Sequence, residues 1–275
     1  MRVVILCSSV YSETACAMAV RLAETGHAPV GALALSTLNR GTLLRKIGQW
    51  GVRGAARYAR GKLFASRGER GRQAHNPYLQ SLLRHHGGIF RSMWEVSASY
   101  GFPLSYCADQ NAQGSIEQLR KWSPDLIIVT GGNILREQLL NVPRLGVLNA
   151  HLGLLPEIRG MSSPEWSLLS NVPVGVTIHY MDAGIDTGPI LQRYEFPDAH
   201  ASESLSDLRN RLIAFGIEKV AEVVSALDRS GISATPQSHL AEDRQFFVMH
   251  EWLQARAAQC LARHRSVAVT GAVHG

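Results

Sequence analysis

Two polar residues of a chemically useful kind stand near the end of an apolar stretch, in the segment LNAHLGLLPEIRG at residues 148–160. They are Asn149 and His151. Successive side chains of a β-strand point to opposite faces, so two residues that are two positions apart share a face. Pro156 and Gly160 follow and indicate a sharp turn. An amide beside a titratable imidazole at the end of a strand indicates a functional site rather than core packing.

A second polar group follows in VGVTIHYMDAGIDTGPI, residues 174–190. Its strand-like part would place Thr177 and His179 on one face. The loop after it contains Asp182 and Asp186 among glycines, which let a backbone turn tightly or approach a ligand closely. The sequence therefore supplies carboxylates that could join the amide and the imidazole.

The surrounding pattern predicts how these residues are positioned. Short apolar segments alternate with amphipathic ones, which is typical of a mostly parallel sheet with helices on both faces. Ligands of such sheets lie beyond the carboxyl ends of the strands, where Asn149 and His151 would fall. Predicted strands cover 3–7, 29–35, 103–107, 124–132, 145–151, 174–181 and 189–196, and predicted helices cover 12–27, 115–122, 136–141, 163–171, 202–227 and 246–264. Ser12 and Ser115 are the expected N-caps, and Gly26 the expected stop of the first helix.

The ordered motifs between residues 124 and 195 resemble those of the 10-formyltetrahydrofolate-dependent formyltransferases, which include glycinamide ribonucleotide, methionyl-tRNA and amino-sugar enzymes. The resemblance rests on Asn149-x-His151, Leu154-Leu155-Pro156, Arg159-Gly160, Gly175-x-Thr177-x-His179 and Asp186-x-Gly188. It implies a Rossmann-like α/β catalytic domain at 1–197, interrupted by a basic insertion at about 38–100. A helical C-terminal extension would cover 198–275.

The resemblance also implies roles for single residues. It makes Asn149, His151 and Asp186 catalytic, and it gives no metal ligands. The pterin of 10-formyltetrahydrofolate, the formyl donor, would lie against Asn133, Ile134, Leu135, Asp182 and Gly184. Arg159 and His179 are expected to contact the acceptor substrate. For His179 a hydrogen-bonded core histidine is the alternative, for Asp182 a turn cap, and for Arg159 a solvated loop residue.

The chemistry of formyl transfer suits these residue types. An amine attacks the formyl carbon, and negative charge develops on its oxygen. The Asn149 amide and a ring N–H of His151 could donate hydrogen bonds to that oxygen. The carboxylate of Asp186 could orient the imidazole and accept the proton that the amine loses, directly or through water.

Charge is concentrated in one segment. The chain of 275 residues has a formal net charge of +6, yet residues 40–72 contain ten Lys or Arg and a single acid, Glu69. Residues 44–64 could form a helix that packs as a lid, lies on an anionic membrane, or binds a lipid-linked or phosphorylated partner. Binding of nucleic-acid phosphates is a further alternative, which we do not expect. The four scattered cysteines predict free thiols and a cytoplasmic compartment, with peripheral membrane contact as an alternative.

The acceptor is less well defined than the donor. The Leu152-Gly153 pair and the Arg159-Gly160 turn favour a small amine, with a nucleotide- or lipid-linked amino sugar foremost. A formyltetrahydrofolate hydrolase would use the same three residues to deliver water instead of an amine. A non-catalytic membrane- or RNA-associated protein on this fold is the third interpretation. A homo-oligomer stays open.

Overall fold

The computed structural model describes residues 1–36, 48, 51–54, 76–237 and 245–273. The basic segment 44–64, apart from 48 and 51–54, therefore lies outside the described residues, and so do its expected roles. No helix among the described ranges is both long and apolar enough to cross a membrane.

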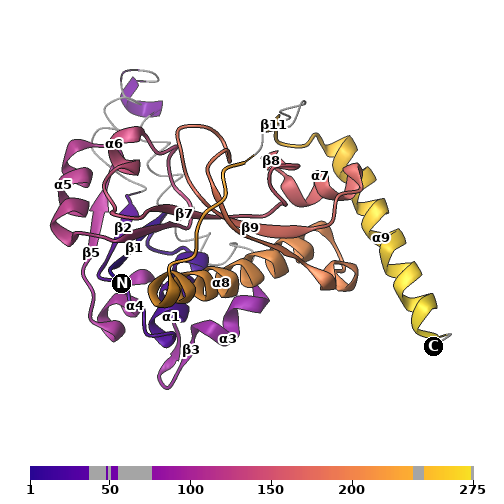
Figure 1. Ribbon diagram of the computed structural model, residues 1–275, viewed down its shortest axis with the longest axis horizontal. Helices are drawn as coiled ribbons and strands as arrows, with labels where there is room; N and C mark the ends of the chain where they lie inside the picture. Colours follow the sequence, from indigo (N-terminus) through magenta and orange to yellow (C-terminus); the bar gives the residue numbers. More distant parts are fainter. Residues whose placement is uncertain (37–47, 49–50, 55–75, 238–244, 274–275) are drawn as a thin grey trace.

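A seven-stranded sheet carries the molecule, with the strand order β10-β9-β7-β6-β1-β2-β5 (Figure 1). The strands from β7 to β5 run parallel, whereas β9 is antiparallel to β7 and β10 is antiparallel to β9. The strands are β1 Val3–Cys7, β2 Gly31–Leu35, β5 Leu104–Cys107, β6 Leu126–Val129, β7 Gly146–His151, β9 Gly175–Tyr180 and β10 Ile190–Glu195. The expected α/β fold with a mostly parallel sheet is confirmed.

Helices cover both faces of the sheet because its central strands are apolar on both sides. In β1, Val3 and Ile5 face the core under α1 and α8, while Val4 and Leu6 face the core under α5 and α6. Figure 1 shows these two layers on opposite sides of the strands. The helices are α1 Glu13–Glu24, α4 Met93–Tyr100, α5 Gln113–Trp122, α6 Glu137–Leu140, α7 Ser163–Ser170, α8 Leu205–Ser230 and α9 Glu251–Val273.

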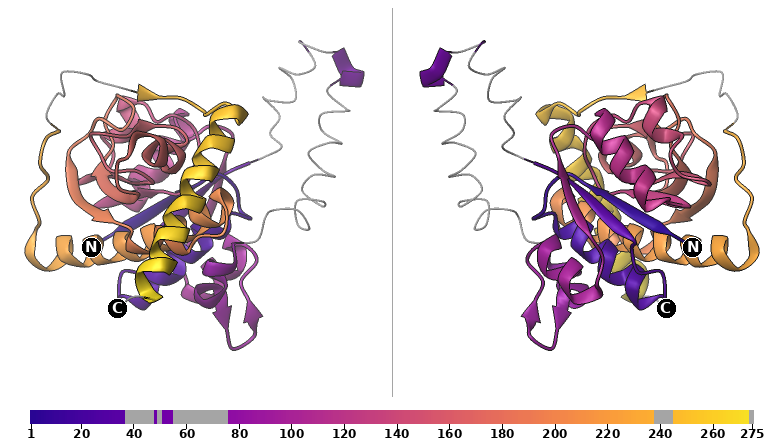
Figure 2. Two further views of the ribbon diagram at one scale, coloured as in Figure 1. Left: turned by 90° about the vertical axis from the view of Figure 1, so that its right-hand side faces the viewer. Right: turned by 90° about the vertical axis from the view of Figure 1, so that its left-hand side faces the viewer.

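Shorter elements complete the described chain. Within the predicted insertion, η1 Pro77–Leu79 and α3 Gln80–Leu83 precede a hairpin of β3 Arg84–His85 and β4 Gly88–Ile89. The 3-10 turn η2 Pro197–Ala201 follows β10. A separate two-stranded sheet consists of β8 Arg159–Gly160 and β11 Gln245–Phe246, which pair in parallel. Two further views show the β11 end and α9 beside the sheet (Figure 2).

Helix α8 packs against one face of β7 and β9, the strands that contain Asn149, His151 and His179 (Figure 1). The Ser204 side chain caps it by accepting a hydrogen bond from the Asp207 backbone N–H. Its Leu208, Leu212 and Val224 are buried in the core that also contains Val176 of β9. α8 therefore shares one core with the sheet, while the proposed division of the chain at 197/198 stays a prediction.

Several sequence predictions need correction at element ends. Ser12 caps α1 as expected, and Gly26 follows its end with a φ of +82°. Helix α5, however, begins at Gln113, and the Ser115 hydroxyl donates to the Asp109 carbonyl instead of capping. The last helix was predicted at 246–264 but begins at Glu251, because residues 245–246 pair with β8 as a strand.

Candidate active site

Asn149 and His179 lie opposite each other on the antiparallel pair β7–β9. The Asn149 Nδ2 atom is 3.3 Å from His179 Nε2. His179 Nδ1 is 2.9 Å from the Tyr180 carbonyl oxygen, which can only accept, so the ring proton belongs on Nδ1. Nε2 is then the acceptor, and the Asn149 amide donates one of its two hydrogens to it. The second amide hydrogen remains for another acceptor.

Burial keeps His179 neutral. Its side chain is 1% exposed, and this desolvation lowers the pKa of the imidazole to about 4, against the raising influence of the Asp186 carboxylate. The structure thus places His179 behind Asn149, where it orients the amide and has little surface for a substrate. Its expected contact with the acceptor stays a prediction.

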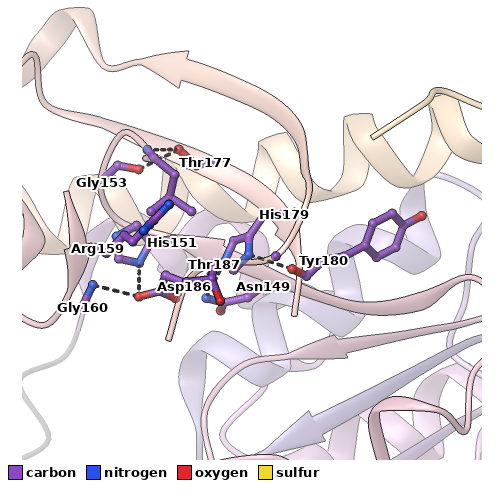
Figure 3. A network of polar contacts seen from close by, with 12 residues as sticks. Asn149, His151, Gly153, Arg159, Gly160, Thr177, His179, Tyr180, Asp186 and Thr187 are labelled. Carbon is purple, nitrogen blue, oxygen red and sulfur yellow. Dashed lines mark hydrogen bonds and ion pairs between the residues drawn. The ribbon is translucent and has the colours of Figure 1, made fainter. Parts of the chain in front are cut away.

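His151 lies on the same face of β7 and points at Asp186 (Figure 3). Its Nε2 is 2.7 Å from the Ile158 carbonyl oxygen, so Nε2 carries a proton. Its Nδ1 is 3.3 Å from Asp186 Oδ2. With Nε2 protonated, Nδ1 is the ring nitrogen that faces the carboxylate, and a proton placed between Nδ1 and Oδ2 would be shared by the two groups. The imidazole and the carboxylate are therefore close enough to exchange a proton.

The backbone holds Asp186 in an unusual conformation. Its φ is +54°, a region that non-glycine residues seldom adopt and that costs about 1–3 kcal/mol. The Gly160 N–H donates to Oδ2 over 2.9 Å, and Oδ1 lies 3.6 Å from His179 Nε2. The carboxylate is thus aimed between the two imidazoles. The conformation is one that Asp and Asn tolerate better than most residues.

The glycines around Asp186 allow close packing of two chain segments. A side chain at Gly188 would meet the Tyr180 carbonyl oxygen at 1.9 Å. Gly160 has a φ of +96°, and a Cβ there would meet the Phe246 carbonyl oxygen at 2.1 Å. The Asp186 loop can lie against the end of β9, and β8 against β11, only because these two positions lack a side chain.

The residues expected to hold the pterin follow β6 or lie in the Asp186 loop. The Asn133 backbone N–H donates to Gln110 Oε1, and its side chain donates to Asp109 Oδ1. Ile134 is 83% exposed and Leu135 is buried. These contacts are compatible with a surface that offers an apolar side chain to a flat ring.

The remaining pterin candidates form a compact turn. Asp182 Oδ1 accepts from the Gly184 N–H and from the Thr187 hydroxyl, so this side chain caps its own loop. A pterin contact by Asp182 or Gly184 stays a prediction.

Arg159 is connected to the Asp186 loop through Gln237, a residue that the sequence analysis did not identify. The buried Arg159 side chain donates from Nε and Nη2 to Gln237 Oε1, over 3.2 and 2.9 Å. Gln237 Nε2 donates to the carbonyl oxygens of Asp186 and Gly188. Gln237 ends the loop-like segment SGISATPQ, residues 230–237, in which no sequence signal marks it as a functional residue.

The described side chains offer no group of three or more metal-ligating residues. The structure brings Asn149, His151, His179 and Asp186 together from β7, β9 and the following loop. It places the pterin candidates 133–135 on a separate loop after β6. The site therefore combines an amide donor with an imidazole–carboxylate pair.

Comparison with known proteins agrees with this arrangement. Residues 93–224 match the family described as Formyl transferase. A methionyl-tRNA formyltransferase from Pelobacter propionicus is 33% identical over 146 residues, which is 52% of this chain and 46% of that protein. The chain thus spans about half the length of the curated relatives that it matches.

Solved structures share the fold at lower identity. Glycinamide ribonucleotide transformylase 1 from Symbiobacterium toebii superposes with a TM-score of 0.53 and 17% identity, covering 86% of this chain and 94% of that one. An N-formyltransferase from Helicobacter canadensis, solved with folinic acid and dTDP-3-aminofucose, gives a TM-score of 0.53 and 13% identity, covering 90% and 71%. The part of this chain that matches the formyl transferase family, residues 93–224, contains Asn149, His151, His179 and Asp186.

Proposed function

We propose that this chain is an N-formyltransferase that moves the formyl group of 10-formyltetrahydrofolate to the primary amine of a small molecule. The observation that carries the proposal is the approach of the Asp186 carboxylate to His151 Nδ1 at 3.3 Å beside the Asn149 amide. Asn149 and His151 come from β7 and Asp186 comes from the loop after β9, and the three side chains meet at the carboxyl end of β7.

In this proposal the chain's residues divide the work. The amine nitrogen bonds to the formyl carbon, and the bond from that carbon to N10 of the folate breaks. The free N–H of Asn149 donates to the formyl oxygen as negative charge develops there, an interaction worth on the order of 2.7–4 kcal/mol. The His151–Asp186 pair takes the proton that the amine loses and returns it to the departing nitrogen. Donation by His151 itself to the formyl oxygen stays a prediction, since protein atoms face both its ring nitrogens.

A polar cavity supports a small hydroxylated acceptor, an amino sugar being our first choice. It has a volume of about 230 Å³ and lies at the carboxyl end of β1, two strands from β7. Its described lining includes Ser8, Ser9, Thr14, Asn76 and Glu13. Hydroxyl, amide and carboxylate groups of this kind suit sugar hydroxyls. The fold shared with the Helicobacter canadensis protein, solved with an amino-sugar nucleotide, is consistent with this choice.

Methionyl-tRNA is the second candidate acceptor. It is favoured by the curated relatives, which are methionyl-tRNA formyltransferases at 32–39% identity over the matched region. The chain matches less than half of their length, so their acceptor does not transfer to it directly.

One set of incubations separates these functions. The chain is mixed with 10-formyltetrahydrofolate and, in parallel, with nucleotide-linked amino sugars, with methionyl-tRNA, or with no acceptor, and release of tetrahydrofolate is followed. Release that depends on an amino sugar supports the proposal, and release that depends on the tRNA supports the second candidate. Equal release without an acceptor would identify a hydrolase, and no release in any arm would contradict transfer altogether.

A further inference from the structure

We propose that Gln237 is a positioning residue of the formyl-transfer site, acting through the backbone of the Asp186 loop. This inference rests on the proposed function, and Gln237 lies outside the family-matched residues 93–224. It would make the C-terminal extension a working part of the site.

The amide of Gln237 connects two chain segments. Its Nε2 donates to the Asp186 carbonyl oxygen over 2.9 Å and to the Gly188 carbonyl oxygen over 2.7 Å. Both amide hydrogens are therefore used on one loop. Its Oε1 accepts from two nitrogens of the buried Arg159 guanidinium. A single neutral side chain thus ties the Asp186 loop to β8.

The backbone of Gln237 is itself held in place. Two residues earlier, Thr235 forms a pair of backbone hydrogen bonds with Ile190 of β10, at 2.8 and 2.7 Å. This antiparallel bridge fixes the chain beside the strand that leaves the Asp186 loop. The position of the Gln237 amide is therefore set by the sheet and does not depend on a free loop.

The hydrogen bonds of Gln237 explain how the Asp186 carboxylate stays directed at His151 although the backbone of Asp186 is strained. A residue at a φ of +54° persists only when its surroundings over-determine the conformation. Gln237 fixes the Asp186 carbonyl, and the Gly160 N–H fixes the carboxylate at Oδ2. Without the first contact, the backbone can relax and swing the carboxylate away from His151. A displacement of about 1 Å at a reacting group can lower a rate by about 100-fold.

Three variants test this role in the full chain. Gln237→Met removes every hydrogen bond of the amide at similar size, and Gln237→Glu keeps an acceptor for Arg159 but has no N–H for the two carbonyls. Gln254→Met is the matched control, because Gln254 of α9 also donates from Nε2 to a backbone carbonyl, that of Met249. We expect both Gln237 variants to lower kcat by about 10- to 100-fold with KM values within about threefold, and the control to match the wild type.

A substrate-free readout accompanies the kinetics. Imidazole ¹⁵N signals report the contact between His151 and Asp186 directly, and we expect them to move in both Gln237 variants but not in Gln254→Met. Native kcat and unmoved signals in either Gln237 variant would overturn the inference, as would a kcat loss that merely follows loss of folded protein. If the wild type transfers no formyl group, the proposed function fails, and the imidazole signals alone then decide whether Gln237 positions Asp186.

Discussion

The Asn149 side chain donates to a histidine that burial keeps neutral: Nδ2 of Asn149 lies 3.3 Å from Nε2 of His179, directly across two antiparallel strands. The histidine settles which way the amide faces, because its Nδ1–H is already committed to the Tyr180 carbonyl. The relationship gives His179 a defined task in orienting the amide, and it leaves one Asn149 N–H for the formyl oxygen.

Replacing Asn149 by Ala removes that hydrogen bond to the developing oxyanion. We expect kcat to fall by about 100- to 1,000-fold with little change in the KM for folate, because the lost interaction strengthens only in the transition state. Steady-state formyl transfer measures the effect. Asn141→Ala, at the end of α6, is the control and should retain native kcat. A loss in Asn149→Ala smaller than about fivefold would remove the assigned role.

The pH dependence of stability should carry the signature of His179. Its pKa is about 4 in the folded chain, against an ordinary value of 6.5. At pH values between 4 and 6.5 the unfolded chain binds a proton at this histidine that the native chain does not bind. The contribution of His179 to the free energy of unfolding is therefore fully present above pH 6.5 and declines as the pH falls toward 4. From pH 7 to pH 5 the decline attributable to this group is about 2 kcal/mol.

Urea unfolding of the wild type and of His179→Gln at both pH values isolates this contribution. Carboxylates remote from His179 titrate alike in the two proteins and cancel in the comparison. The wild type should lose more stability than the variant on going to pH 5. Parallel losses in the two proteins would mean that His179 is not held neutral by burial.

Asp186→Asn should separate catalysis from folding. Asparagine tolerates a positive φ and can still accept from the Gly160 N–H, so we expect near-native stability. It cannot hold the proton shared with His151, and transfer should fall by about 100-fold or more. Asp186→Ala removes the same carboxylate but strains the backbone, so it should be about 1–2 kcal/mol less stable than Asp186→Asn. Equal stability of the two variants, or native turnover in either, would contradict these assignments.

Gly160→Ala should damage the structure and the site together. Gly231→Ala is the control, since Gly231 also has a positive φ, +61°, but nothing lies within 4 Å of a Cβ there. Gly231→Ala carries only backbone strain, of about 1 kcal/mol. Gly160→Ala adds a clash with the Phe246 carbonyl, so it should lower the free energy of unfolding by a larger amount and also reduce kcat. Denaturant unfolding and turnover of the two variants check this, and equal destabilisation would show that β8 and β11 can separate freely.

Much of the sheet could be predicted because its strands are short, apolar and bounded by Gly or Pro. The position of Asn149 and His151 at a carboxyl end followed from the same pattern. The direction of β9 could not be read, because a buried strand has the same composition whether its neighbour is parallel or antiparallel. That direction is what places His179 opposite Asn149.

The contacts made late in the chain were beyond sequence pattern. The predicted last helix begins at residue 246, yet backbone pairing with β8 takes Phe246, together with Gln245, into a strand. Gln237 is 51 residues from Asp186 in sequence. Its amide meets the loop only through the Thr235–Ile190 bridge, for which no local motif exists. Ser115 is not the N-cap because the helix begins two residues earlier, at Gln113.

The pairing of β11 with β8 has a consequence for recombination between related proteins. Residues 245–246 form one strand of this pair. The other strand, β8, contains Gly160, whose N–H donates to the Asp186 carboxylate. A hybrid that keeps residues 1–224 of this chain and borrows a foreign tail would lose its partner for β8 and the amide at position 237 at a single junction. Such a hybrid can keep its main sheet and still lack catalytic turnover. An exchange of tails therefore preserves the site only when residues 235–246 of this chain are kept together with residues 1–224.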